Sequence, residues 1–391
     1  MSVGREFDVV LFGATGFTGA LTAEYLAANA PNGCRWAIAG RSREKLVAVR
    51  ERLAEINPSC ADLDLLVADV TDRDSLTDVA VRSRVVVSTV GPYLAYGEPL
   101  VAACAAAGTD YLDLTGEPEF VDRMYLAHHE AAQASGARLV HCCGFDSIPY
   151  DLGAYFTVQQ LPADVPIHLQ GFVSASATFS AGTYHSAITA FSRLREMSAV
   201  ARQRREAEPR PDARRVRGEK GRPRHEKAVD AWVLPAPTID PQVVLRSARA
   251  LDRYGPAFTY GHYVAIKKLP IAAAVVGGVG AAALLAQVPP ARRWLLGRKT
   301  AGDGPTEAQR EKAWFRVLFV GEGGGKRVVT QVSGGDPGYG ETSKMLAESA
   351  LCIAFDNLPK SSGQVTTAVA MGDKLLNRLV RAGLKFEVLS S

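Results

Sequence analysis

Near the start of the chain, three glycines are spaced as in a loop that binds a diphosphate. They lie in the sequence GATGFTG, between an apolar run and a segment with helical periodicity. Glycine lets the backbone turn tightly and approach an anion closely, and the helix that follows directs its N–H groups and positive dipole end toward that anion. Threonine hydroxyls between the glycines add hydrogen-bond donors. The residues expected to contact a dinucleotide are Gly13, Thr15, Gly16, Phe17, Thr18 and Gly19.

A basic residue follows the second expected strand, where NAD-dependent enzymes carry an acidic one. Asp or Glu at that place binds the 2′-hydroxyl of the adenosine ribose. Arg41, followed by Ser42, instead offers a guanidinium, which binds phosphate through charge-assisted and often bidentate bonds. We therefore expect NADP(H) as the cofactor, with a solvated surface arginine as the alternative. Asp69, after the third strand, is expected either to border the adenine or to cap a turn or helix.

These residues need a sheet to hold them, and residues 1–150 have the pattern of one. Short apolar runs alternate six times with segments of helical periodicity, which is typical of a doubly wound parallel α/β sheet of the Rossmann type. The cofactor of such a sheet lies at the carboxyl ends of the strands, where the strand order reverses. Thr89, Gly91 and Pro92 follow the fourth strand and are expected to border the nicotinamide. The expected strands are 7–12, 35–39, 63–67, 85–91, 111–114 and 137–142.

Beyond residue 150 the pattern is that of an α+β domain with an antiparallel sheet. Residues 167–177 alternate like a half-exposed strand, and 313–333 favour a hairpin around GEGGG. Residues 201–227 carry eleven Lys and Arg against five Asp and Glu, which predicts a solvated basic loop. We thus expect an NADP-binding domain over 1–150 and a substrate or dimerisation domain over 151–391. Its expected helices lie near 182–200, 269–288, 341–357 and 371–382.

The segment 269–288 carries no charged residue and is long enough to cross a hydrocarbon core. Lys267 and Lys268 precede it and Arg292 and Arg293 follow it, so the positive-inside rule gives it no orientation. Spanning would also separate the hairpin from the rest of its domain. Three interpretations stay open: a spanning helix, a helix that lies on a membrane or lines a lipid entry, and a buried helix of a soluble domain.

The composition is that of a globular protein and excludes several other classes. The chain has 391 residues, of which 47% are hydrophobic, and a formal net charge of +4, which is too small to indicate a nucleic-acid binder. Its six cysteines form no CxxC pair, so no metal site is expected, and free thiols suit a reducing compartment. No basic-then-apolar leader precedes Phe7. We expect a cytoplasmic protein, with peripheral binding at the cytosolic face of the plasma membrane left open.

Several longer stretches of the chain carry a family resemblance. They are GATGFTG, AGRS, TVGPY, GTDYLDLTGE, CGFDSIPYDLG, SAGTYHSA and GGDPGYGETSKMLAESAL. With these stretches the chain resembles the saccharopine dehydrogenase-like oxidoreductases, and among them the mycobacterial trans-acting enoyl reductases. The resemblance implies NADPH-dependent reduction of a carbon–carbon double bond. It also implies a polyketide-type acyl substrate, held by the carrier protein of a separate synthase, in the assembly of cell-wall glycolipids.

Enoyl reduction needs a hydride at the β-carbon, a proton at the α-carbon and a donor for the developing enolate oxygen, although water can supply the proton. Tyr93, beside the expected nicotinamide loop, is the first candidate donor, with packing against the cofactor as the alternative. Tyr184 and His185 are further candidates, with a structural histidine as the alternative. Asp146 is expected either to cap a helix or to act chemically, and Glu117 to border the cofactor.

Two other functional classes remain open at this point. One is an NADP-binding, membrane-associated protein without turnover, because no unmistakable acid–base pair is present. The other is a dehydrogenase of small polar amino or keto acids, although residues 180–187 offer no arginine for a substrate carboxylate. The Tyr-xxx-Lys pair of short-chain dehydrogenases is absent from the first 250 residues. A homodimer is also left open.

Overall fold

Seven parallel strands form the first sheet, in the order β14-β6-β5-β4-β1-β2-β3. Their central strands are runs of Val, Ile, Leu and Phe that are buried on both faces, as a parallel sheet between two helical layers requires. The order of the first six reverses between β1 and β4, so the expected doubly wound parallel sheet is confirmed. The strands are β1 (Phe7–Phe12), β2 (Trp36–Gly40), β3 (Asp64–Val67), β4 (Ser83–Ser88), β5 (Asp110–Asp113), β6 (Arg138–Val140) and β14 (Gly363–Val365).

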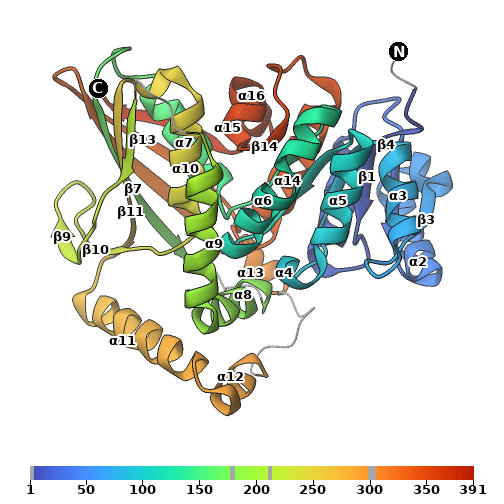
Figure 1. The fold of residues 1–391 in the computed structure, drawn as a ribbon, viewed down its shortest axis with the longest axis horizontal. Helices are drawn as coiled ribbons and strands as arrows, with labels where there is room; N and C mark the ends of the chain where they lie inside the picture. Colours follow the sequence, from blue (N-terminus) through green and yellow to red (C-terminus); the bar gives the residue numbers. More distant parts are fainter. Residues whose placement is uncertain (1–3, 177–180, 210–213, 298–304) are drawn as a thin grey trace. The chain divides into compact units, whose positions relative to one another are not determined.

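The computed structural model describes residues 4–176, 181–209, 214–297 and 305–391. The chain divides into two compact units (Figure 1). The first contains the residues up to Phe145 together with Tyr339–Arg378, and the second contains most of Asp146–Gly338 together with Leu379–Ser391. The first unit holds the parallel sheet, and the second holds a mixed sheet.

Helices cover both faces of the first sheet because the chain winds in two directions. From β1 to β3 it moves one way, and from β4 to β6 the other, so right-handed crossovers place α1 and α2 on one face and α3, α5 and α6 on the opposite face. The helices of this unit are α1 (Phe17–Asn29), α2 (Arg43–Ile56), α3 (Arg73–Arg82), α4 (Tyr93–Tyr96), α5 (Glu98–Ala107), α6 (Pro118–Ser135), α14 (Gly340–Phe355), α15 (Thr367–Ala370) and most of α16 (Gly372–Arg381).

Helix α14 returns from the far end of the sequence to complete this unit. It packs against α1 and against β1, β4 and β5, whereas α1 packs on β1 and α2 on β2 and β3. Nearly all of its residues from Thr342 to Ala354 are buried. Because a parallel sheet must bury both faces, the segment that supplies this cover joins the first unit. The division expected from the sequence instead assigned all of 151–391 to the second domain.

Eight strands form the second sheet, in the order β15-β13-β12-β7-β11-β10-β9, with β8 beside β11. β11 pairs in parallel with β7 and β8, and the other neighbours are antiparallel. The expected hairpin is confirmed and turns at Gly324 and Gly325, whose φ angles are 59° and 77°. The strands are β7 (Ile167–Ser176), β8 (Arg215–Gly218), β9 (Arg224–Glu226), β10 (Ala231–Pro235), β11 (Ala257–Ile266), β12 (Trp314–Gly323), β13 (Lys326–Gly334) and β15 (Lys385–Ser390).

Helices α7 and α10 pack on this second sheet. α7 lies so close that a Cβ on Gly153 would be 2.3 Å from the ring of Phe319 in β12. The expected helix at 182–200 is two helices that meet at Arg193. The helices are α7 (Ile148–Val158), α8 (Ala181–Ser192), α9 (Leu194–Ala207), α10 (Asp240–Ala250), α11 (Leu269–Ala286), α12 (Pro289–Leu296) and α13 (Glu307–Glu311).

About half of the segment 201–227, expected to be a solvated basic loop, is regular structure, although its described residues other than Arg204 are exposed or half-buried as expected. Helix α9 extends into it, and β8 and β9 lie within it, while 210–213 fall outside the described residues. Local ion pairs explain the difference, because the guanidinium of Arg204 is buried and lies 3.2 Å from the carboxylate of Glu208. The same carboxylate lies 3.9 Å from Arg246 and 3.7 Å from Arg249 of α10. Charge that a loop would expose to water is therefore partly paired within the fold.

Candidate cofactor-binding and catalytic residues

The glycine loop after β1 is packed so tightly that two of its glycines have no room for a side chain. A Cβ on Gly19 would lie 2.1 Å from the carbonyl oxygen of Gly13. Gly13 has a φ of 97°, and its Cβ would lie 2.7 Å from the hydroxyl of Thr89. Gly16 differs, because the nearest atom to its Cβ would be the Gly13 oxygen at 3.5 Å. Gly13 and Gly19 thus close the turn, and Gly16 keeps open the place where a diphosphate must approach.

Helix α1 begins at this loop without a side-chain cap. Its N-cap is Gly16, and its first turn carries no acidic residue. The side chain of Thr15 is exposed, Thr18 is half-buried, and the ring of Phe17 packs edge-on against Tyr339 at 4.7 Å between centroids. A helix start of this kind favours an anion through its N–H groups and dipole. The loop and helix therefore fit the diphosphate of a dinucleotide.

Arg41 follows β2 and lies beside the segment after β3. Its side chain is 78% exposed, and its Nε atom is 3.9 Å from a carboxylate oxygen of Asp69. The same carboxylate accepts hydrogen bonds from the N–H and hydroxyl of Thr71, which hold the pKa of Asp69 below its usual range. Ser42 caps α2 by accepting the N–H of Lys45 at 3.3 Å. An exposed guanidinium at the end of β2 fits a 2′-phosphate, while Ser42 has a structural bond of its own.

The loop after β4 meets the glycine loop through Thr89. The Thr89 hydroxyl donates to the carbonyl of Gly13 at 3.1 Å, and the Thr89 N–H donates to the carbonyl of Phe12 at 3.0 Å. These bonds hold together the ends of β1 and β4, where the strand order reverses. Gly91 and Pro92, next along the chain, are exposed. The loop can therefore border a nicotinamide with its exposed residues while Thr89 fixes its position.

Tyr93 is held inside the first unit by two hydrogen bonds. Its hydroxyl donates to the carbonyl of Ser88 at 3.0 Å and accepts the N–H of Leu114 at 3.2 Å. The residue is 7% exposed, and burial raises its pKa well above the usual value. Glu117 fixes the same turn by accepting the N–H groups of Tyr93 and Leu94 at 3.1 and 2.8 Å. These bonds favour a structural role for Tyr93 over proton donation. Glu117 caps the start of α4.

Tyr184 and His185 lie together on α8 in the second unit, and both are half-buried. The hydroxyl of Tyr184 donates to the carbonyl of Leu295 at 3.1 Å, and Nε2 of His185 lies 3.0 Å from the carbonyl oxygen of Leu296. Because a carbonyl only accepts, the His185 proton in this bond is on Nε2. The last turn of α12 thus orients both candidate donors.

A buried pair on the first unit was missed by the sequence reasoning. Nδ1 of His141 lies 2.6 Å from a carboxylate oxygen of Asp113, and both side chains are almost fully buried. The other oxygen of Asp113 accepts the N–H groups of Thr115 and Cys142. Within the described residues, Nε2 of His141 has no hydrogen-bond partner. Asp113 is the last residue of β5 and His141 directly follows the neighbouring β6, but nothing in their spacing along the chain separates them from ordinary strand-end residues.

A second buried polar cluster lies in the second unit around Asp240. Ser147 donates to Asp240 at 3.3 Å, and Nε2 of His262 lies 3.6 Å from its other oxygen. Tyr260 bonds to Nδ1 of His262 at 3.0 Å. Burial raises the pKa of Asp146 to about 6 and that of Asp240 to about 7, and it lowers that of His262 to about 3. Sequence reasoning noted Asp146 and missed Asp240 and His262, which lie about a hundred residues further along the chain.

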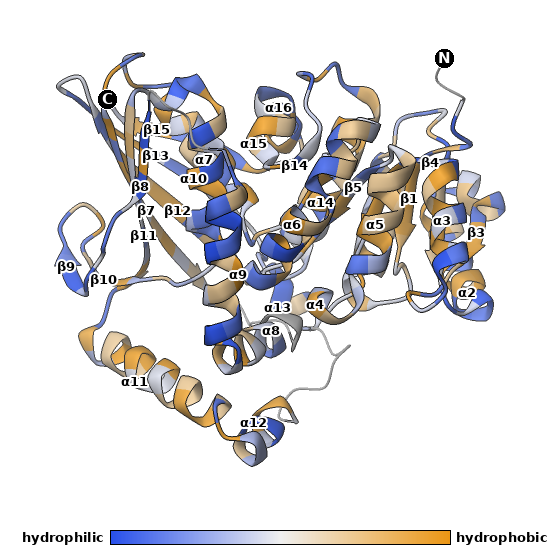
Figure 2. Cartoon of the chain, viewed as in Figure 1, coloured by the Kyte–Doolittle hydropathy of each residue, from blue (hydrophilic) through white to orange (hydrophobic). Residues whose placement is uncertain are grey.

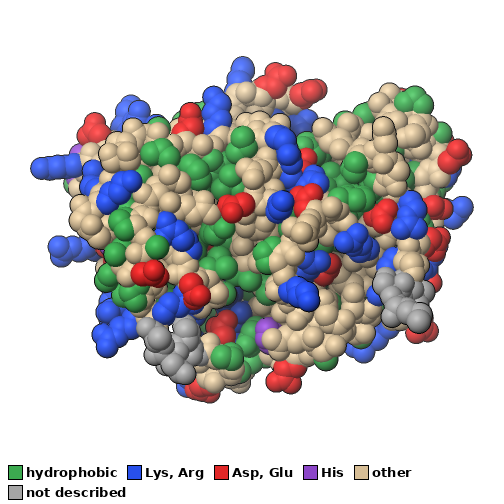
Figure 3. Space-filling model, turned by 90° about the horizontal axis from the view of Figure 1, so that it is seen from above, with side chains coloured by type: hydrophobic (Ala, Val, Ile, Leu, Met, Phe, Trp, Pro, Cys, Tyr) green, Lys and Arg blue, Asp and Glu red, His purple; other side chains and the backbone are tan. Residues whose placement is uncertain are grey.

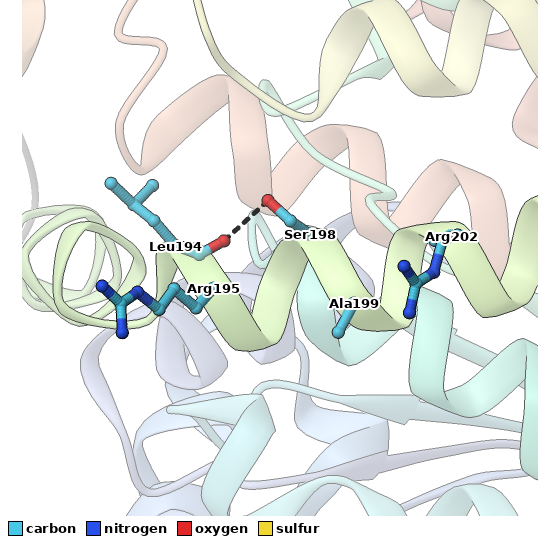
Figure 4. A pocket seen from close by; sticks show the side chains of 5 residues that line it. All are labelled: Leu194, Arg195, Ser198, Ala199 and Arg202. Carbon is cyan, nitrogen blue, oxygen red and sulfur yellow. Dashed lines mark hydrogen bonds between the residues drawn. The ribbon is translucent and has the colours of Figure 1, made fainter.

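Helix α9 borders a shallow cavity of about 470 Å³ (Figure 4). Two arginines, Arg195 and Arg202, project from the helix along it, with Leu194 and Ala199 as apolar neighbours. The hydroxyl of Ser198 donates back to the carbonyl of Leu194 at 2.7 Å. The cavity therefore offers two cations next to apolar surface.

Comparison with known proteins finds matches to the first part of the chain and to its whole length. Residues 9–140 match the model of the saccharopine dehydrogenase NADP binding domain. A putative trans-acting enoyl reductase of Mycobacterium tuberculosis is 39% identical, over 98% of this chain and 97% of its own length. A trans-acting enoyl reductase of Mycobacterium leprae is 36% identical, over 97% of each chain. Among solved structures, saccharopine dehydrogenase (L-Glu forming) of Saccharomyces cerevisiae shares the fold, with a TM-score of 0.56 at 13% identity over 98% of this chain and 99% of its own.

Proposed function

We propose that this chain, which belongs to the family of the trans-acting enoyl reductases, uses NADPH to reduce the carbon–carbon double bond of an acyl thioester. The observation that carries the proposal is the 39% identity over 98% of the chain, which includes both units and not the NADP-binding part alone. The chain is accordingly an NADP-dependent oxidoreductase of that family.

The cofactor would be held by the residues after β1, β2 and β4. Gly13 to Gly19 would bind the diphosphate, Arg41 the 2′-phosphate, and Gly91 with Pro92 would border the nicotinamide. When bound, NADPH supplies a hydride equivalent. The balanced reaction places that hydride on the β-carbon and a solvent-derived proton on the α-carbon, so that the enoyl group becomes saturated and NADPH becomes NADP⁺.

The chain's own task is then to orient the acyl group and to control the proton. Tyr184 and His185 are the proposed donors, because both are half-buried polar groups on one helix. Each would have to exchange its hydrogen bond to an α12 carbonyl for one to the substrate. We assign Tyr93 a positioning role instead, since its hydroxyl is already engaged twice and is buried.

The substrate is proposed to be a polyketide-type acyl chain on the carrier protein of a separate synthase. Arg195 and Arg202, on the exposed side of α9, would pair with acidic carrier side chains or with a phosphate of the carrier's arm. The double variant Arg195→Ala/Arg202→Ala should raise KM for a carrier-bound enoyl group and leave KM for a small free enoyl thioester unchanged. A native KM for the carrier-bound substrate in that variant would remove α9 from the proposal.

The protein is proposed to act in the cytoplasm, at the cytosolic face of a membrane that holds the long acyl products of glycolipid assembly. The test of the function is NADPH consumption with a panel of enoyl thioesters of increasing length, next to panels of amino acids and keto acids. Oxidation that requires an enoyl thioester supports the proposal. Turnover of polar acids alone, or NADPH binding without any turnover, would contradict it.

A further inference from the structure

Helix α11 is apolar along its whole length, yet it is not a core helix. Its 18 residues have a mean hydropathy of 2.1, and 11% of the helix is buried. Figure 2 shows it as a hydrophobic rod at the edge of its unit, followed by α12. Within the described residues, the buried members of α11 are Ala272 and Ala286. Of the three interpretations of this segment, the buried helix of a soluble domain is therefore wrong for the isolated chain.

The large side chains of this segment face outward. Ile271 is 52% exposed, Val276 51%, Leu284 73%, and Trp294 of α12 54%. A Cβ on Gly277, Gly278 or Gly280 would meet no described atom within 4 Å beyond the neighbouring residues and backbone of its own helix. Apolar patches that large are uncommon on soluble monomers and mark surfaces that bind a partner or a lipid phase.

The charged residues around α11 distinguish a protein partner from a lipid surface. Residues 253–302 contain no Asp or Glu, whereas Lys267, Lys268, Arg292 and Arg293 stand at the two ends of the apolar stretch. On the face drawn in Figure 3, by contrast, basic and acidic side chains are interspersed. A second copy of the chain docked through α11 would set cations against cations. An anionic lipid surface complements both the apolar length and its basic ends.

The connections of α11 hold it along such a surface and not across it. β11 ends at Ile266, shortly before α11, and α11 also packs against β10 and α8 of the same unit. At the other end, Ala286 and Leu295 pack with Ile188 of α8 in one cluster. Both ends of α11 are therefore anchored to one folded unit. A spanning helix would need its two ends on opposite sides of a bilayer.

We propose that residues 267–296, the lipid-docking segment, lie in the headgroup region of an anionic bilayer. The apolar side chains of α11 and Trp294 enter the acyl boundary, and the four flanking cations contact anionic headgroups. The segment also carries the carbonyls that orient Tyr184 and His185, so docking occurs beside the proposed proton donors. Binding to lipid does not depend on the proposed function; only its purpose, access to membrane-borne acyl chains, rests on it.

The test is sedimentation of the full-length protein with vesicles of phosphatidylcholine, with and without phosphatidylglycerol, at low salt. We expect binding to the anionic vesicles, loss of that binding at high salt, and complete extraction by alkaline carbonate. Val276→Glu/Leu284→Glu should weaken binding at least tenfold, as should Arg292→Gln/Arg293→Gln. Matched controls are Ile56→Glu, an exposed apolar position of the first unit, and Arg381→Gln/Lys385→Gln, which should bind as the native protein does. Trp294→Phe should lose most of the lipid-induced change in tryptophan emission.

Three results would overturn the proposal. Equal sedimentation of the native protein and Val276→Glu/Leu284→Glu would show that α11 does not bind lipid. Resistance to carbonate would indicate a spanning helix. A dimer in light scattering that Val276→Glu/Leu284→Glu dissociates, without vesicle binding by the native protein, would make α11 a protein interface. NADPH oxidation with a small soluble enoyl thioester, measured without vesicles, should be unchanged in Val276→Glu/Leu284→Glu and in the two control variants, so that a failed reductase and a failed membrane contact are told apart.

Discussion

The Nε atom of Arg41 lies 3.9 Å from a carboxylate oxygen of Asp69, at the ends of β2 and β3. The Arg41 side chain is 78% exposed, and a pair at this distance in water contributes little free energy. Asp69 has its own hydrogen bonds from Thr71, so it does not depend on the arginine. The guanidinium can therefore leave Asp69 for a phosphate at small cost, which suits it to the 2′-phosphate of NADP(H).

Arg41→Ala should separate the two cofactors. Loss of charge-assisted bonds of about 1.5–3 kcal/mol in total predicts about 10- to 100-fold weaker NADPH binding. NADH affinity should not change, because that cofactor lacks the 2′-phosphate. Cofactor titration of fluorescence measures both. Arg43→Ala, two residues further along the chain, serves as the matched control and should leave NADPH affinity at the native value.

The glycine loop predicts opposite outcomes for two similar substitutions. Gly19→Ala forces a Cβ to within 2.1 Å of the Gly13 carbonyl, so it should lower the free energy of unfolding by about 2–3 kcal/mol. Gly16→Ala has room and a φ of −82°, so its stability should fall by less than about 1 kcal/mol. Its methyl group would stand where the diphosphate approaches, and NADPH affinity should fall about tenfold or more. Tight NADPH binding by Gly16→Ala would mean that the cofactor does not approach this loop.

The Rossmann half of the molecule was predictable because its signals are local. Each strand is a short apolar run, the glycine spacing fixes the turn, and the pattern repeats within thirty or so residues. The participation of α14 was not predictable in this way, since it depends on which part of the sheet the earlier helices of the unit leave uncovered. Asp240 and His262 were not predicted as members of a polar cluster for the same reason, because only the folded second unit brings them together.

Two tyrosines should respond differently to loss of their hydroxyls. Tyr93→Phe leaves the buried Ser88 carbonyl and Leu114 N–H without their bonds, which should cost about 1–3 kcal/mol of stability. The pH profile of kcat should be unaffected by that change. Tyr184→Phe, in contrast, should lower kcat about 100-fold if its hydroxyl protonates the product, with little change in KM. A fall in kcat for Tyr93→Phe with native thermal stability would reverse this assignment.

Asp240→Asn should change how stability depends on pH. The folded pKa of Asp240, about 7, is raised by burial and by the charge of Asp146, and it lies above the unfolded value. Protonated Asp240 therefore contributes to the free energy of unfolding. This contribution has its full value below about pH 4 and is lost as pH rises through 7. His262, with a folded pKa of about 3, acts in the opposite direction as pH falls, and the buried Tyr150 and Tyr260 stay neutral across this range.

The comparison of Asp240→Asn with the native protein separates the titration of Asp240 from that of the other groups. Relative to the native protein, the variant should gain on the order of 1–3 kcal/mol between pH 5 and pH 8, measured by denaturant unfolding at each pH. The exposed Asp62→Asn is the matched control and should leave the difference between the two pH values unchanged. A constant difference between Asp240→Asn and native protein at both pH values would show that Asp240 does not titrate in this range.

The most direct measurement of the central claim is the fate of the hydride. The full-length protein is incubated with NADPH that carries deuterium at both C4 positions of the nicotinamide and with a 2-enoyl thioester on a carrier protein, and the acyl product is analysed by mass spectrometry and NMR. We predict one deuterium at the β-carbon of a saturated acyl chain for each NADPH consumed. An unreduced enoyl chain, or a saturated product without deuterium, would contradict the assignment of this chain as an NADPH-dependent enoyl reductase.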